Sequence, residues 1–117
     1  MSMTRPDTLT GPTYCVIIEN DQQMYVTVNH DEHGTPCEVF VRTDDPALFE
    51  WVTLVTVLIT RLLRAEQPLE VIAAELQEIH SPRTRHWVPG GKGECPSLAA
   101  RIGMVLARHI EAMKEAA

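Results

Sequence analysis

The chain changes its hydrophobic period once, at Asp44-Asp45-Pro46, and this change constrains the fold more than any other feature of the sequence. Before it, apolar and polar side chains alternate, as in Met24 to Asn29, which is typical of half-buried strands. After it, apolar residues recur every three or four positions, which is typical of helices that face a core. Strands followed by helices predict an α+β fold.

Three strands are predicted before the change of period, over Tyr14 to Glu19, Met24 to Asn29 and Cys37 to Arg42. All three contain β-branched residues, which favour strands. The segments that join them are short and polar, and Gly34 in the second can adopt the positive φ that a tight turn needs. We therefore expect a three-stranded antiparallel β-meander.

Three helices are predicted after the change, over Ala47 to Arg64, over Leu69 to Ile79 and from Pro96 onwards. Acidic capping residues and Pro46 favour the start of the first helix, because the first turn does not need the N–H that proline lacks. Each helix has one apolar face directed at the core: Val52, Val55, Ile59 and Leu63; then Val71, Ile72, Leu76 and Ile79; then Leu98, Ile102, Val105, Leu106 and Ile110. We expect all three helices to pack on the sheet.

The first helix carries more apolar surface than one face can bury. Leu48, Leu54, Leu58 and Leu62 extend it well beyond the first stripe, so the helix needs burial on two sides. The sheet can cover one side, and a second helix or another subunit must cover the other. We expect this helix to form the interface of a dimer or higher homo-oligomer, which would also stabilise a chain this short.

The 117 residues suit one domain. We predict a flexible leader over residues 1–12, a single domain over residues 13–112 and a frayed C-terminus over residues 113–117. The polar N-terminus does not resemble a signal peptide, and an odd number of cysteines, three, predicts free thiols in a reducing cytoplasm.

The net charge of −6 argues against general affinity for nucleic acids or anionic membranes. The longest apolar run, Trp51 to Leu63, contains three threonines and Arg61. It is therefore predicted to be too short and too polar to span a bilayer.

Residues 80–93 form a loop that differs in charge from the rest of the chain. Residues 1–78 carry thirteen acidic and four basic side chains, whereas residues 79–93 carry Arg83, Arg85 and Lys92 and no acid. An acidic chain therefore holds one basic segment, and this segment leads into the start of the last helix.

The residue types of this loop suit an anion. Arginine offers a planar fork to phosphate, glycine lets backbone N–H groups approach a ligand, and tryptophan can stack on a base. The following helix adds the positive end of its dipole. The candidate ligand-binding residues are Arg83, Arg85, His86, Trp87, Gly90, Gly91 and Lys92.

Other interpretations of the same residues stay open. Arg83 and Arg85 could pair with Glu75 or Glu78 and only balance the acidic body, with Trp87 as a loop anchor. A redox or metal-linked role through Cys95, His80 and His86 is weaker, because no second cysteine is placed to resolve an oxidised form. The pair His30 and His33 in a turn is an incomplete metal site. No catalytic motif stands out, so no catalytic residue, cofactor or metal is expected.

Segments across the chain resemble a known family. Met24 to Gly34 and Cys37 to Arg42 match its first half, and Gly90-Gly91 leads through Cys95-Pro96-Ser97 into the last helix. Together they resemble the TSCPD domain found at the C-terminal end of adenosylcobalamin-dependent ribonucleotide reductases. Of the motif Thr-Ser-Cys-Pro-Asp that names the family, Cys95-Pro96 is kept, and Ser97 replaces the aspartate.

The resemblance covers residues 11 to 110 and implies an α+β fold and an accessory, non-catalytic role. The chain is similar to small stand-alone members of a type carried by bacteriophages and prophages. It is predicted to bind a small nucleotide-like anion, and in a phage protein this binding could act by sequestration. The alternative is a protein-interaction module, an accessory to a ribonucleotide reductase or another host enzyme.

Overall fold

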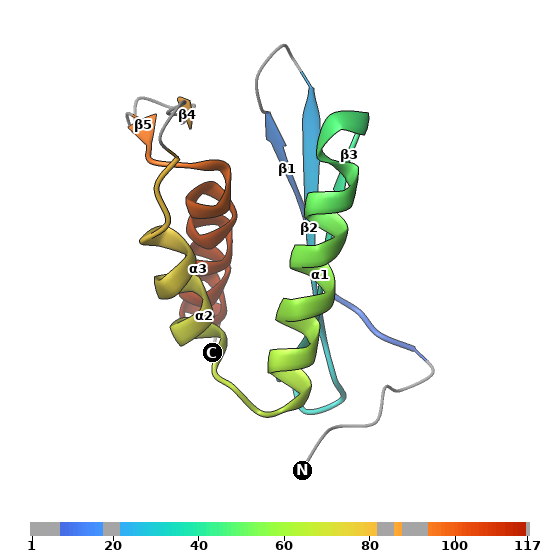
Figure 1. The fold of residues 1–117 in the computed structure, drawn as a ribbon. Coiled ribbons are helices and arrows are strands. Elements are labelled where there is room, and N and C mark those ends of the chain that lie inside the picture. The colour runs from blue at the N-terminus through green and yellow to red at the C-terminus, as the bar shows by residue number, and fades with distance from the viewer. Residues whose placement is uncertain (1–7, 18–21, 82–85, 88–93, 117) are drawn as a thin grey trace. The chain divides into compact units, whose positions relative to one another are not determined.

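A computed structural model describes residues 8–17, 22–81, 86–87 and 94–116. It confirms the α+β fold, with a three-stranded antiparallel sheet followed by three helices (Figure 1). Contacts divide the chain into two compact units, Met1–Gln67 and Pro68–Ala117. The first unit holds the sheet and one long helix, and the second holds the other two helices. A single domain over residues 13–112 stays a prediction.

The sheet contains the three expected strands in the order β1 (Thr13–Ile17), β2 (Gln23–His30) and β3 (Pro36–Thr43). The alternation of β2 sets which face is buried. Met24, Val26 and Val28 have no exposed surface, and Val26 and Val28 lie opposite Val41 and Val39 of β3. The strand periodicity read from the sequence is therefore confirmed.

The end of the predicted leader is paired to the sheet. Val28 donates its N–H to the carbonyl of Pro12 at 3.1 Å, and His30 donates to the carbonyl of Thr10 at 2.8 Å. Between these two bonds the backbones come so close that a Cβ on Gly11 would lie 1.7 Å from the Val28 oxygen. Gly11 is therefore required where the chain enters the sheet.

A 3₁₀ helix, η2 (Pro46–Leu48), leads into the long helix α1 (Phe49–Arg64). Asp45 caps this start as expected, because its Oδ1 accepts the N–H of Ala47 at 2.9 Å. Val52, Ile59 and Leu63 of α1 are buried, which confirms most of the predicted inner stripe.

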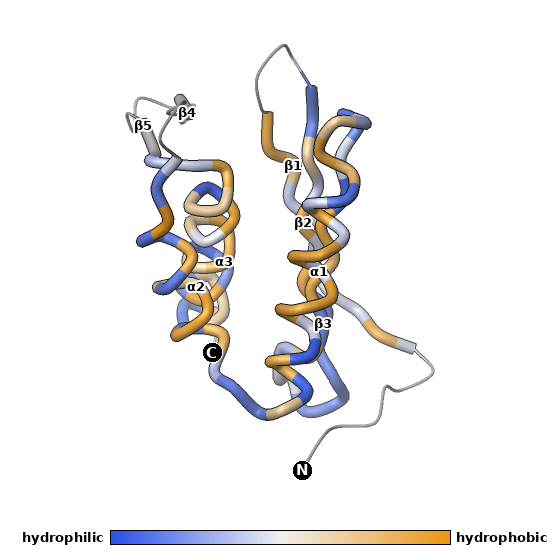
Figure 2. Tube along the Cα trace, in the orientation of Figure 1, coloured by the Kyte–Doolittle hydropathy of each residue, from blue (hydrophilic) through white to orange (hydrophobic). Residues whose placement is uncertain are grey.

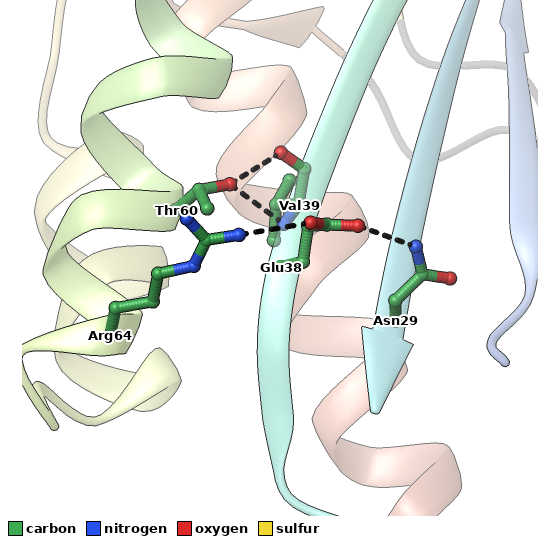
Figure 3. A network of polar contacts seen from close by, with 5 residues as sticks. All are labelled: Asn29, Glu38, Val39, Thr60 and Arg64. Atoms are coloured by element: carbon green, nitrogen blue, oxygen red, sulfur yellow. Dashed lines mark hydrogen bonds and ion pairs between the residues drawn. The ribbon is translucent and has the colours of Figure 1, made fainter. Parts of the chain in front are cut away.

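Two threonines of α1 take the place of a fourth strand along the free edge of β3. The hydroxyl of Thr60 accepts the N–H of Val39 at 3.2 Å and donates to its carbonyl at 3.0 Å (Figure 3). The hydroxyl of Thr56 does the same with Val41, at 2.7 and 3.3 Å. Four residues of helix rise about 6 Å and two residues of strand about 6.6 Å, so the two spacings match.

Arg64, one turn beyond Thr60, extends this contact to a buried carboxylate. Its Nη2 lies 3.2 Å from Oε2 of Glu38, whose side chain is 2 % exposed (Figure 3). Asn29, opposite Glu38 in the sheet, donates its Nδ2–H to Oε1 at 3.0 Å. A charge this deeply buried needs such partners, because each unpaired polar atom would be costly to desolvate.

The helix α1 ends in a Schellman motif, in which two N–H groups beyond the helix bond back to carbonyls of its last turn. Glu66 donates to Leu63 at 2.9 Å, and Gln67 donates to Leu62 at 3.0 Å. Glu66 has a φ of 65°, a value that glycine adopts more readily. Pro68 follows at once, and the second unit begins there.

The side of α1 away from the sheet is exposed. Leu54, Leu58 and Leu62 are 55, 54 and 44 % exposed, and hydrophobic colour recurs along the length of the helix (Figure 2). By length and composition alone, the 19 residues Pro46–Arg64 could cross a membrane, whereas the apolar run Trp51 to Leu63 was predicted to be too short and too polar to do so. In this structure α1 is instead packed against the sheet, through the hydrogen bonds of Thr56 and Thr60 to β3 and through its buried inner stripe.

In the second unit, α2 (Leu69–Gln77) packs against α3 (Leu98–Ala116). The predicted face of α2 was partly wrong, since Val71 and Ile79 are 48 and 46 % exposed. Ile72 is buried as predicted, and Leu69 and Ala73 are buried where the sequence did not predict it. The small side chain of Ala73 allows the close approach of Gly103 in α3, where a Cβ would lie 2.8 Å from the Ala73 carbonyl.

Two short strands were missed. Residues 80–93 were expected to contain no regular structure, but β4 (His86–Trp87) pairs antiparallel with β5 (Glu94–Cys95). Two residues are too few to show a hydrophobic period, so only the pairing itself reveals such a strand.

The predicted apolar face of α3 is confirmed in most positions. Buried are Ile102, Val105, Leu106 and Ile110, and Leu98 is half-buried.

Replacing the edge threonine tests its role in place of a strand. Thr60→Val keeps the shape but leaves the N–H and C=O of Val39 without the hydroxyl, and we expect a loss of about 1–3 kcal/mol in the free energy of unfolding. Thr53→Val is the matched control, because Thr53 is exposed and its hydroxyl bonds only within α1, to Phe49. Urea denaturation followed by circular dichroism measures both, and equal losses would contradict the assignment.

Substitution at the helix contact gives a second test. An exposed Gly→Ala change in a helix normally stabilises by up to about 1 kcal/mol. At Gly103 the added methyl meets the backbone of Ala73, so we expect Gly103→Ala to destabilise the protein by about 1–3 kcal/mol. Thermal unfolding gives the sign of this change in stability. An increase in Tm would contradict the assignment of a close contact between Gly103 and the backbone of Ala73.

Candidate functional site

Most of the predicted site residues lie outside the described part of the chain. This holds for Arg83, Arg85, Gly90, Gly91 and Lys92. The backbones of His86 and Trp87 are described and form β4. The structure therefore places the frame of the candidate loop rather than its basic side chains.

The two ends of this loop are held together by backbone contacts. Ser81 donates its N–H to the carbonyl of Pro96 at 2.9 Å. Further along, His86 pairs with Cys95 and Trp87 with Glu94. The segment thus leaves the end of α2 and returns to the start of α3, with β4 and β5 side by side near that end of the helix (Figure 1).

Ser97 joins this loop to both helices. Its hydroxyl accepts the N–H of Ala100 at 2.9 Å, which makes Ser97 the N-cap of α3. The same hydroxyl donates to the carbonyl of Ile79, just beyond α2, at 2.6 Å. Ser97 is buried, so both bonds are shielded from water.

The cap changes how α3 can contribute to a binding site. The sequence suggested that unpaired N–H groups at the start of this helix would help to hold an anion. The N–H of Ala100 is already bonded to Ser97. One of the N–H groups at the start of this helix is therefore already satisfied within the protein.

The alternative metal sites gain no support from the described residues. Within them, no three His, Cys, Asp or Glu side chains gather in a way that could hold a metal ion. Asp31, between His30 and His33, instead shapes the hairpin, because its Oδ1 accepts the N–H groups of His33 and Thr35 at 2.8 and 3.0 Å. The bond from Thr35 is the main cause that lowers the pKa of Asp31 below its ordinary value.

The possible partners of the loop arginines and two of the cysteines lie on different elements. Glu75 and Glu78 are exposed at the end of α2. Cys15 is exposed on β1, and Cys37 is buried on β3. The side chain of Cys95 lies outside what the structure describes, so its redox role stays a prediction.

A comparison with protein families decides the identity of this arrangement. The model of the TSCPD domain matches residues 1–110 of the 117-residue chain. The chain belongs to the TSCPD domain family. None of the curated proteins matches it, and neither does any solved structure.

Membership of the TSCPD family gives the residues around Ser97 a physical meaning. Ser97 stands where the motif that names the family has aspartate, and serine and aspartate are both preferred N-caps. The departure from the motif therefore preserves the cap. A hydroxyl can also donate a hydrogen bond, which an ionised carboxylate cannot do, and here it donates to Ile79.

The sequence contained a signal for the cap but none for the loop closure. A serine directly before an apolar helical run is a recognisable N-cap. Its second partner, Ile79, is 18 residues away, and the pairing of Ser81 with Pro96 involves only backbone atoms. Neither contact leaves a local pattern of side chains.

Substitutions at Ser97 separate these two bonds. Ser97→Ala removes both, and we expect it to lower the free energy of unfolding by about 1–2 kcal/mol. Ser97→Asp restores the cap but not the bond to Ile79, so we expect it to recover only part of the loss. Ser97→Thr retains a hydroxyl and is the control. If chemical denaturation showed Ser97→Ala to be as stable as the wild type, the cap would have no energetic role.

Proposed function

We propose that this TSCPD domain is a non-catalytic binding module for a small anionic ligand. A nucleotide or a nucleotide-derived signal is the ligand that fits the residue types of the loop best. The observation that carries the proposal is the position of the basic segment. Residues 79–93 hold three basic side chains and no acid, and the described contacts close this segment at the start of α3.

Closure matters because a loop with fixed ends loses less conformational entropy when a ligand orders it. The bond from Ser81 to Pro96 and the pairing of β4 with β5 hold the two sides of the segment near one another. The described contacts therefore hold the two sides of the candidate loop together at its base. A base of this kind suits a site in which several side chains converge on one phosphate.

Each candidate residue has a role in this proposal. Arg83, Arg85 and Lys92 would contact phosphate oxygens, with His86 available to add charge. Gly90 and Gly91 would offer backbone N–H groups, and Trp87 would stack on a base or cover the ligand. None of these roles requires bond making, so a bound nucleotide would be released unchanged.

A small binding protein without catalysis can act by sequestration. In a cytoplasmic, phage-borne member of the family, such binding would lower the free concentration of a nucleotide signal. The association of TSCPD domains with ribonucleotide reductases supports the alternative, in which the basic loop docks an acidic surface of a host enzyme.

Native mass spectrometry with a panel of linear and cyclic nucleotides tests the proposal. We expect the wild type to retain one nucleotide class, and Arg83→Ala/Arg85→Ala to weaken that binding at least about tenfold, since charge-assisted hydrogen bonds are lost. The matched control is Arg108→Ala/Lys114→Ala, which removes the same charge from exposed positions on α3.

The outcomes separate the candidate functions. Binding that both double variants weaken equally would reflect only net charge and would overturn the loop assignment. A wild type that retains no nucleotide would overturn the proposal and favour the protein accessory, which a pull-down from host extract would then test. Conversion of the nucleotide during incubation would contradict the absence of catalysis.

A further inference from the structure

The exposed side of α1 carries a continuous apolar stripe. Leu54, Leu58 and Leu62 follow one another at intervals of four residues and are about half exposed. Trp51 is half-buried and lies on the same side of the helix as these leucines, because at about 100° per residue it falls between Leu58 and Leu62 around the axis. Val55, also half-buried, lies between this side and the stripe that packs on the sheet. Soluble proteins rarely expose contiguous apolar surface of this kind unless it binds something.

Two opposite charges border the stripe along the same flank. Glu50 lies in the first turn of α1 and Arg61 in the last turn, and both are exposed. They are eleven residues apart, close to three full turns, so they point in nearly the same direction about 16 Å apart along the helix axis. The midpoint between them falls at Val55 and Thr56, within about one residue of the centre of the apolar side that runs from Trp51 to Leu62.

This arrangement is complementary to itself when reversed. If two α1 helices pack antiparallel about a two-fold axis at that midpoint, each flank faces the same flank of the other helix. Glu50 of one copy then lies level with Arg61 of the second copy, and the same pair forms again at the other end. Leu58 of one copy falls at the level between Trp51 and Leu54 of the second, where it can insert between them.

We propose that α1 is the isologous interface of a homodimer, in which two copies pack antiparallel through Trp51, Leu54, Leu58 and Leu62 and are held in register by two Glu50–Arg61 pairs. A second copy fits better than an unrelated partner because the two charges lie nearly symmetrically about the centre of the apolar side from Trp51 to Leu62. A lipid surface would require neither a matched acid and base nor any symmetry between them. The proposal does not depend on the anionic ligand.

The size of the surface sets the expected strength of association. A helix of 16 residues is about 24 Å long, so one helix face falls well short of the roughly 800 Å² per partner of a standard interface. We therefore expect a dimer that dissociates at micromolar concentrations. The charge pairs would fix register and orientation more than they add affinity.

Charge reversal provides the test, read by sedimentation equilibrium of the full chain from about 1 µM to about 200 µM, the range for an interface of this size. Glu50→Arg places like charges together at both ends of the interface, and so does Arg61→Glu. We expect each single variant to weaken the dimer by about tenfold or more. The combined Glu50→Arg/Arg61→Glu variant rebuilds both pairs in reverse and should restore dimerisation.

The matched control is Glu75→Arg, Arg108→Glu and their combination, which make the same charge changes at exposed positions of α2 and α3. These three variants should leave the dissociation constant unchanged. Because Glu50 and Arg61 are exposed, reversing them should not prevent folding, and circular dichroism checks this. A wild type that stays monomeric throughout the range would overturn the proposal, and so would a dimer that the combined variant fails to restore.

Discussion

The hydrogen bonds between the hydroxyls of Thr56 and Thr60 and the backbone of β3 are the contact on which the first unit depends. An edge strand presents N–H and C=O groups that must find partners. A neighbouring strand would normally supply them, whereas here one face of a helix does so. This choice fixes the rotation of α1 about its own axis. It thereby determines that Val52, Ile59 and Leu63 face the sheet and that Leu54, Leu58 and Leu62 do not.

The same rotation explains the remaining features of α1. Arg64, four residues after Thr60, reaches the buried carboxylate of Glu38, which also binds Asn29 on the neighbouring strand. The polar side of the helix is therefore occupied by the edge of the sheet. The apolar surface that exceeds what the sheet can bury is left on the other side, and this is the surface that we assign to a second copy.

The sequence predicted the order and type of the main elements because their periods are long enough to recognise. The alternation of β2 and the spacing of Ile102, Val105 and Leu106 in α3 each repeat several times. The predictions failed where local pattern carries no information. Val71 and Ile79 are as apolar as Ile72, so hydrophobicity alone does not show which of them is buried where Ala73 and Gly103 approach closely. Likewise, the four residues of β4 and β5 are identified by their pairing alone.

For the candidate site, the basic residues of the loop could be predicted from the sequence, whereas the contacts that hold its two ends together could not. Arg83, Arg85 and Lys92 stand out because they interrupt an acidic chain, which any reading of charge reveals. The bonds from Ser97 to Ile79 and from Ser81 to Pro96 join residues that are far apart in the chain. From sequence alone, the substitution of serine for aspartate at Ser97 was only a departure from the family motif. In the structure it preserves the cap of α3 and adds a donor.

The threonine contacts also limit how this sheet can grow. Uncontrolled fibre formation by edge pairing requires two open edges on every molecule, since each added chain must offer a new edge to the next. In the three-stranded sheet, the β3 edge is occupied by a helix of its own chain, and β1 forms the other edge. Pairing through β1 would therefore stop after one addition. A three-stranded sheet with a single open edge can therefore form a pair with another copy but cannot extend into a fibre by edge pairing.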